Sequence, residues 1–168
     1  GRFKRILITG GAGFIGSNLV KKLLLDTNLI VFNLDKISYS SDKFFINHLE
    51  NKKNNNYKFL NVDLHNKIKT RNAVDNCKPD LIINLAAESH VDKSILKARL
   101  FLESNTIGTF NLLDASRNYW EMLPIEKKHN FMFLQISTDE VFGSLGKTGK
   151  FSEISQYNPS SPYSASKA

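Results

Sequence analysis

The sequence has 168 residues, 41% of them hydrophobic, and a single cysteine, Cys77, which fits one globular domain and excludes an internal disulfide or a cysteine-based zinc site. No stretch approaches the roughly 20 apolar residues that cross a bilayer, and no signal peptide begins the chain, so we expect a cytoplasmic protein without membrane or metal partners. The net charge of +7 favours anionic ligands, but the lysines are spread among asparagines without a basic block, so nucleic acid is not expected to bind.

Apolar runs of strand length recur along the chain at 3–9, 29–34, 57–61, 81–85 and 131–136. Segments with helical spacing lie between them; Leu19, Leu23 and Leu24 share a face in the first, and the longest covers about 92–119. Strands alternating with helices predict an α/β fold, a Rossmann-type doubly wound parallel sheet with helices on both faces. The Asn/Lys-rich stretch at 51–56 is expected to form a surface turn rather than a domain boundary.

Glycines at positions 10, 13 and 16 follow the first apolar run directly and open the first helical segment. This spacing allows a tight turn, close approach of backbone to a pyrophosphate, and a helix N-terminus that faces the phosphates. Asp35 stands 19 residues after Gly16, at the end of the second strand, where a carboxylate binds the adenosine ribose. The pattern predicts NAD rather than NADP, because the carboxylate repels a 2′-phosphate; the neighbouring Lys36 weakens this preference.

Tyr163 and Lys167 are four residues apart and share one face of a helix that Ser161 caps and Pro162 begins. A free tyrosine titrates near pH ~10, so base catalysis near neutral pH requires the phenolate to be favoured. A nearby ammonium and the positive nicotinamide ring both do this. The pair therefore predicts hydride chemistry on a sugar hydroxyl.

Residues 137–140 follow the fifth strand, at the sheet edge where open α/β folds hold their ligands. Adjacent carboxyls at Asp139 and Glu140 suit an acid and a base for the elimination of water, since close like charges encourage one to stay protonated. The alternative is that both carboxylates stabilise the first turn of a following helix. Val141-Phe142-Gly143 interrupts that helical pattern.

These motifs closely resemble the extended short-chain dehydrogenase/reductase superfamily, and within it the nucleotide-sugar 4,6-dehydratases. The resemblance covers essentially the whole chain and corresponds to the N-terminal half of such an enzyme. Both ends of the sequence look cut, so we expect an incomplete NAD-binding domain over 1–168, without the C-terminal substrate-binding part and with weak or absent turnover alone. The matching segments are 10–16, Asp35-Lys36-Ile37-Ser38-Tyr39, 85–94, 137–143 and 161–168.

The resemblance implies that Tyr163 accepts the 4-hydroxyl proton, Lys167 holds the nicotinamide ribose, and Thr138 binds the sugar 4-oxygen. Glu140 would remove the proton at carbon 5 while Asp139 protonates the departing 6-hydroxyl, converting dTDP-glucose to its 4-keto-6-deoxy form. Ser89 would lie near the sugar nucleotide. Beside Tyr163 and Lys167, the cofactor residues implied are Gly10, Gly13, Phe14, Ile15, Gly16, Asp35, Lys36, Ile37, Ser38, Asp63, Leu64, Leu85, Ala86, Ala87, Glu88, Ser89 and Ser104.

Several assignments have plainer alternatives. Ala86 and Ala87 can be small for packing, Asp63 can simply end a strand, and His90 is expected to be structural. Ser104 and Phe142 depart from the threonine and tyrosine usual in the family.

The whole chain could also belong to a UDP-sugar epimerase or decarboxylase, or to a regulatory module that binds NAD without catalysis. The resemblance further suggests a homodimer packed through the helix near 92–119 and the last helix.

Overall fold

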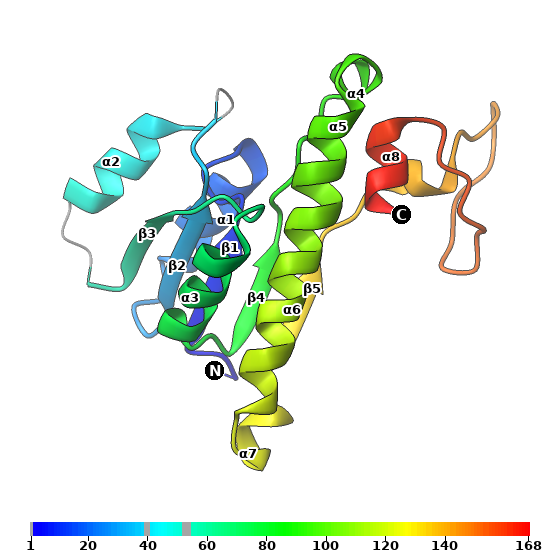
Figure 1. The fold of residues 1–168 in the computed structure, drawn as a ribbon. Helices are drawn as coiled ribbons and strands as arrows, with labels where there is room; N and C mark the ends of the chain where they lie inside the picture. The colour runs from blue at the N-terminus through cyan, green and yellow to red at the C-terminus, as the bar shows by residue number, and fades with distance from the viewer. Residues whose placement is uncertain (1, 39–40, 52–54) are drawn as a thin grey trace.

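The computed structural model describes residues 2–38, 41–51 and 55–168, and its centre is a five-stranded parallel sheet. The strand order is β3-β2-β1-β4-β5 (Figure 1). Their bounds are Arg5–Thr9 for β1, Ile30–Asp35 for β2, Tyr57–Asn61 for β3, Leu81–Asn84 for β4 and Met132–Gln135 for β5. All five predicted strands are therefore confirmed, each within two residues at either end. Tyr39 and part of the turn expected at 51–56 lie outside the described residues.

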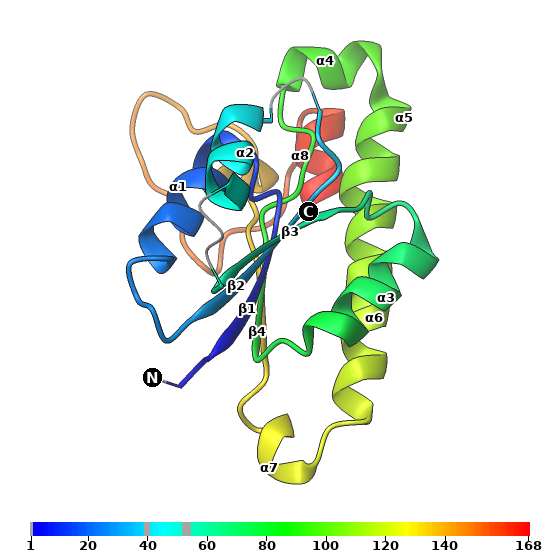
Figure 2. The ribbon, with the colours of Figure 1, turned by 90° about the vertical axis from the view of Figure 1, so that its left-hand side faces the viewer.

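Helices cover both faces of the sheet, as predicted. Figure 2 shows α1 (Phe14–Leu23) and α2 (Lys43–Asn51) on one face, and α3 (Lys67–Cys77) and α6 (Gly108–Glu121) on the other. Alternate side chains of the central strand β1 pack against these two layers of helices. Leu7 packs in the cluster that includes α3 and α6, whereas Ile6 and Ile8 pack with the α1 and α2 side. Cys77 is buried in the first cluster, as expected for an inert thiol.

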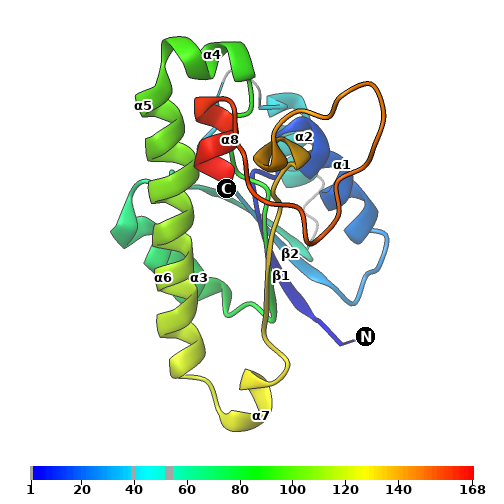
Figure 3. The ribbon, with the colours of Figure 1, turned by 90° about the vertical axis from the view of Figure 1, so that its right-hand side faces the viewer.

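The long helix expected at 92–119 is interrupted. It consists of α4 (Val91–Leu96), α5 (Ala98–Phe101), a π-helical turn η1 (Leu102–Ile107) and α6. Beyond α6 lies the short α7 (Ile125–Lys128) at the opposite end from α4 (Figure 3). Among the described residues, no helix combines the length and apolar character needed to cross a membrane.

The last helix, α8 (Pro162–Lys167), begins where the sequence predicts. Ser161 is its cap: the Ser161 Oγ accepts from the backbone N of Ser164 at 3.0 Å, and the Ser164 Oγ accepts from the backbone N of Ser161 at 3.0 Å. This reciprocal capping fixes the start of a helix too short to be stable alone. Figure 3 shows α8 beside α5, so the Tyr/Lys pair is brought to the same edge as the ends of the strands.

Polar side chains cross the sheet where β1, β4 and β5 end. Thr9 donates to the Asn84 side-chain oxygen, and the Asn84 Nδ2 donates to Gln135 Oε1 at 2.7 Å and to Thr109 Oγ1 at 3.2 Å. Thr9 Oγ1 also accepts from the backbone N of Ala86 at 3.3 Å. Because Thr9 and Asn84 are fully buried, leaving any of these groups unpaired would be costly. The network therefore fixes the strand ends from which the site is built.

Candidate active site

A cavity of about 470 Å³ runs along the carboxyl edge of the sheet, over the ends of β1, β2 and β4. It brings together residues from the glycine-rich turn, the strand ends, η1 and α8. Among the described residues predicted to bind the cofactor, only Ile37 is not part of its lining. The cavity also includes residues that sequence reasoning did not assign to it: Leu34, Ser41, Val62, His90, Ile136 and Ser137.

The glycine-rich turn is packed too tightly for side chains. Gly10 has a φ of +70°, and a Cβ there would lie 2.7 Å from the backbone N of Ala86. At Gly16 a Cβ would lie 2.2 Å from the carbonyl oxygen of Gly10. No side chain caps the following first turn of α1, so its N–H groups are available to an anion at this end of the cavity. The turn therefore fits a pyrophosphate.

Asp35 ties the end of β2 to that turn. Its carboxylate accepts from the backbone N of Ala12 at 3.0 Å and from the backbone N of Ile37 at 3.1 Å. Burial raises the pKa of Asp35, and these two hydrogen bonds, with Ser41 and Lys36, oppose the rise. Oδ1 also accepts from Ser41 Oγ at 3.5 Å, whereas Oδ2 accepts only from Ala12 among the described residues, so Oδ2 keeps a lone pair for a ribose hydroxyl. Ile37, with a φ of +50°, takes part in this anchoring through its backbone N–H, which donates to Asp35, and not through its side chain.

Asn105 is a residue of the site region that sequence reasoning missed. It lies in η1 and is 2% exposed. Its side chain accepts from the backbone N of Glu88 at 2.8 Å and donates to the backbone O of Glu88 at 3.0 Å and to Ser166 Oγ at 2.9 Å. It thereby joins the loop after β4 to α8. A polar residue in a helical segment expected to be buried was the available signal.

The segment after β5 carries the predicted acid and base. Thr138 begins the 3-10 turn η2 (Asp139–Phe142), and its Oγ1 accepts from the backbone N of Glu140 at 3.3 Å. Both carboxylates thus lie in the first turn of a short helix, as the plainer alternative supposed, while Gly143 ends it at a φ of +91°. The two interpretations are compatible, because a stabilised turn also fixes where the carboxylates lie.

Tyr163 lies within reach of this segment. Its ring packs edge-on against Phe101 with centroids 6.3 Å apart. Burial raises the pKa of Tyr163, the Thr138 side chain opposes the rise, and the charges of Glu140 and Asp139 add to it. The phenol, hydroxyl and two carboxylates predicted to act together therefore interact in the structure.

Lys167 lies on the same face of α8 as Tyr163, and both line the cavity. Its Nζ donates to the backbone O of Ile136 at 2.6 Å, and burial lowers its pKa. The expectation that this ammonium lowers the pKa of Tyr163 is wrong for this geometry. The pKa of Tyr163 is raised, and Lys167 is not among the groups that change it. The reason is that the ammonium is directed to a strand-end carbonyl.

A second cavity, about 650 Å³, lies at the amino edge of the sheet and includes Arg5, Asp80 and Tyr119. The Arg5 guanidinium there is engaged, since its Nε donates to the backbone O of Cys77 at 2.7 Å and it lies over the Phe32 ring. No residue predicted for catalysis or cofactor binding lines this cavity. The carboxyl-edge cavity is therefore the candidate active site.

The strand order, the glycine-rich turn after β1 and the Tyr/Lys helix beside η2 define a Rossmann-type domain of the extended short-chain dehydrogenase/reductase class. More specifically, the chain belongs to the GDP-mannose 4,6 dehydratase family, whose model matches residues 7–168. The family resemblance inferred from the sequence motifs is thus confirmed.

Individual relatives agree with this assignment. A probable dTDP-glucose 4,6-dehydratase of Sinorhizobium fredii is 48% identical over 164 residues, which cover 98% of this chain and 46% of the relative. The structure of dTDP-glucose 4,6-dehydratase from Bacillus anthracis in complex with NAD superposes with a TM-score of 0.79 at 36% identity, over 98% of this chain and 47% of that one. A UDP-Glc/GlcNAc 4-epimerase from Campylobacter jejuni gives 0.82 at 28% identity, over 98% and 46%. The chain spans about half the length of the curated relatives it matches.

Proposed function

We propose that residues 1–168 form the NAD-binding domain of a nucleotide-sugar 4,6-dehydratase that converts dTDP-glucose to dTDP-4-keto-6-deoxyglucose. The observation that carries the proposal is the arrangement after β5: Thr138 Oγ1 lies 3.3 Å from both Asp139 Oδ1 and the backbone N of Glu140, and the charges of both carboxylates act on the Tyr163 phenol. A base for a hydroxyl proton and an acid/base pair for elimination then act on one substrate. The curated relatives named as dTDP-glucose 4,6-dehydratases favour this substrate over other nucleotide sugars.

The cofactor fits the residues present. The glycine-rich turn and the first turn of α1 would hold the pyrophosphate, Asp35 the adenosine ribose, and Tyr163 and Lys167 the nicotinamide ribose. Bound NAD would supply a hydride acceptor at carbon 4 and a hydride donor at carbon 6. Asp63, Leu64, Ser104 and residues 85–89 line the same cavity and would contact the cofactor, with Ser89 also near the sugar nucleotide.

The chain's own residues would then divide the proton transfers. Tyr163 takes the 4-hydroxyl proton, while Thr138 orients the 4-oxygen through its hydroxyl. The resulting 4-keto group acidifies the proton at carbon 5, which Glu140 removes. Asp139 protonates the 6-hydroxyl as it leaves. Thr138 Oγ1 lies 3.3 Å from Asp139 Oδ1, so these groups are held in one cluster before substrate arrives.

A chimera tests the proposal, in which residues 1–168 replace the matching half of the Sinorhizobium fredii relative. With dTDP-glucose and NAD it should form the 4-keto-6-deoxy product. Glu140→Gln should reduce product formation about 10²- to 10⁴-fold while reduced nicotinamide still appears in a single turnover, because only the base for carbon 5 is lost. Glu153→Gln, on an exposed residue of the loop after η2, is the matched control and should leave turnover unchanged.

The alternatives give different results in that experiment. A UDP-sugar epimerase or decarboxylase needs only Tyr163, Lys167 and NAD, so unchanged turnover in Glu140→Gln would overturn dehydration in its favour. A non-catalytic module would bind NAD and leave every nucleotide sugar unchanged. The Campylobacter epimerase shares the fold, so the fold alone does not separate these activities.

We also propose that the protein is cytoplasmic and forms a homodimer through η1, α6 and α8. Apolar side chains spaced three apart on the outer face of the long helix support this: Ile107, Phe110 and Leu113 are 39%, 58% and 46% exposed. Phe110→Glu should convert a dimer to a monomer in sedimentation. A wild-type monomer at micromolar concentration would contradict the assignment.

A further inference from the structure

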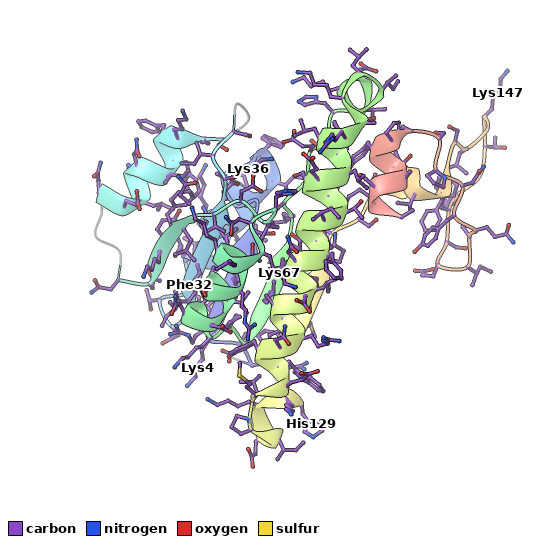
Figure 4. All side chains as sticks on the ribbon, in the orientation of Figure 1. Lys4, Phe32, Lys36, Lys67, His129 and Lys147 are labelled. Carbon is purple, nitrogen blue, oxygen red and sulfur yellow. The ribbon has the colours of Figure 1, made fainter. Side chains whose placement is uncertain are left out.

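An ion pair joins two segments that line the candidate active site. Lys36 directly follows Asp35 at the end of β2 (Figure 4), and its Nζ lies 3.1 Å from Glu88 Oε1 in the loop after β4. The Lys36 side chain is 30% exposed and the Glu88 side chain 12%. Because β1 lies between β2 and β4 in the sheet, the pair spans the carboxyl end of the strand that carries the glycine-rich turn.

The side chain of Asn105 fixes the backbone of Glu88. Asn105 binds both the N–H and the C=O of Glu88, at 2.8 Å and 3.0 Å, and is itself buried. The backbone of Glu88 therefore cannot turn away without breaking two hydrogen bonds in a buried place. Its carboxylate is held toward Lys36, so the ion pair reflects the fold rather than a chance surface contact.

The other charged residues of the cavity make the Lys36–Glu88 ion pair important for cofactor binding. Among the described residues that line the cavity, the basic side chains other than histidine are Lys36 and Lys167, and the acidic ones are Asp35, Asp63 and Glu88. Lys167 lies at the Tyr163 end and is bonded to Ile136. Only Lys36 lies next to Asp35, where the proposed function places the adenosine ribose. A 2′-phosphate at that ribose would need Lys36 as its counter-ion.

We propose that Glu88 is a cofactor-specificity residue: by neutralising Lys36 it prevents this lysine from accepting the 2′-phosphate of NADP, and so enforces selection of NAD. The inference rests on the proposed binding of NAD and adds a second carboxylate to the one at Asp35. Asp35 repels the 2′-phosphate directly, whereas Glu88 acts by engaging the cation beside it. Selectivity thus depends on a residue in the loop after β4 as well as on the end of β2.

Calorimetric titration of residues 1–168 with NAD and with NADP tests the proposal in a double-mutant cycle. Glu88→Gln should lower the ratio of the Kd for NADP to the Kd for NAD about tenfold, because one partly buried ion pair is released and Lys36 is freed for the 2′-phosphate. Lys36→Met should leave the ratio of the two constants within about threefold of the wild-type ratio, because Glu88 already neutralises this lysine. Glu88→Gln combined with Lys36→Met should show no gain for NADP. Glu103→Gln, which breaks the 2.7 Å ion pair with Arg99 outside the cavity, is the matched control.

The outcomes separate the inference from the proposed function. If the wild-type chain binds neither cofactor, the proposed function fails and the inference with it. If it binds NAD but Glu88→Gln does not lower the ratio of the two constants, the inference alone is wrong. A gain that persists in the double variant shows that Glu88 acts without Lys36, which also overturns it. An equal loss of affinity for NAD and NADP in Glu88→Gln would show that Glu88 supports binding of both cofactors without discriminating between them, which also overturns the inference.

Discussion

Replacing Asn105 by leucine tests how strongly the loop after β4 is joined to α8. The substitution keeps the branched shape and the number of side-chain heavy atoms but removes three hydrogen bonds, two to Glu88 and one to Ser166. At about 1 kcal/mol net for each bond, the free energy of unfolding should fall by about 3 kcal/mol, and by more if the Glu88 backbone groups stay unpaired. That is a large part of the roughly 5–15 kcal/mol typical of a domain. Urea unfolding followed by fluorescence of Trp120, the single tryptophan, measures it.

The matched control is Asn130→Leu. Asn130 is exposed, and its side chain donates from Nδ2 to the backbone O of Glu126 at 3.1 Å, so its replacement should cost less than about 0.5 kcal/mol. The slope of unfolding against urea should be the same for both variants, since neither changes the surface exposed on unfolding. A loss for Asn105→Leu within about 0.5 kcal/mol of the control would refute the view that Asn105 joins these elements.

Three further predictions concern the site and the core. Gly16→Ala should weaken NAD binding at least tenfold by titration, because the added Cβ would lie 2.2 Å from a backbone oxygen, whereas Gly146→Ala, with nothing within 4 Å, should bind normally. In the chimera, Tyr163→Phe should lower turnover about 10²- to 10⁴-fold with no reduced nicotinamide in a single turnover; its appearance at the wild-type rate would exclude Tyr163 as the base. Burial raises the pKa of Cys77 to about 12, so alkylation of the folded chain at pH ~8 should be about a thousandfold slower than for an exposed thiol and should rise with pH toward 12; rapid labelling of the folded chain would contradict this.

The strands of the sheet could be predicted because each is marked by a short pattern within its own stretch of sequence. Each strand is a short apolar run bounded by polar or glycine residues, and Ser161-Pro162 is a helix start with a physical reason at each position. The break in the long helix could not be predicted in this way. Residues 92–119 read as one helix, whereas η1 places Asn105 against Glu88 and Ser166, contacts that exist only in the folded chain.

The active site likewise has parts that could be predicted from the sequence and parts that could not. The cavity gathers residues that the motifs assigned to the cofactor, since parallel strands end at one edge and their following loops meet there. The electrostatics of Tyr163 were not predictable from the four-residue spacing to Lys167. Spacing fixes which face a side chain lies on, but the direction of the ammonium depends on the Ile136 carbonyl, which a different segment supplies.

The helix that continues from η1 into α6 constrains the number of residues in this segment as well as their identity. One residue more or fewer in a helix rotates everything beyond it by about 100°. Leu112 and Ala115, which pack in the core beside α3, and Phe110, which faces outward, all follow η1 in the chain. Inserting a residue between η1 and Leu112 would therefore turn buried positions of α6 toward solvent while leaving every side chain chemically intact. A substitution acts at one position, whereas an inserted residue changes the core face and the outer face of α6 together.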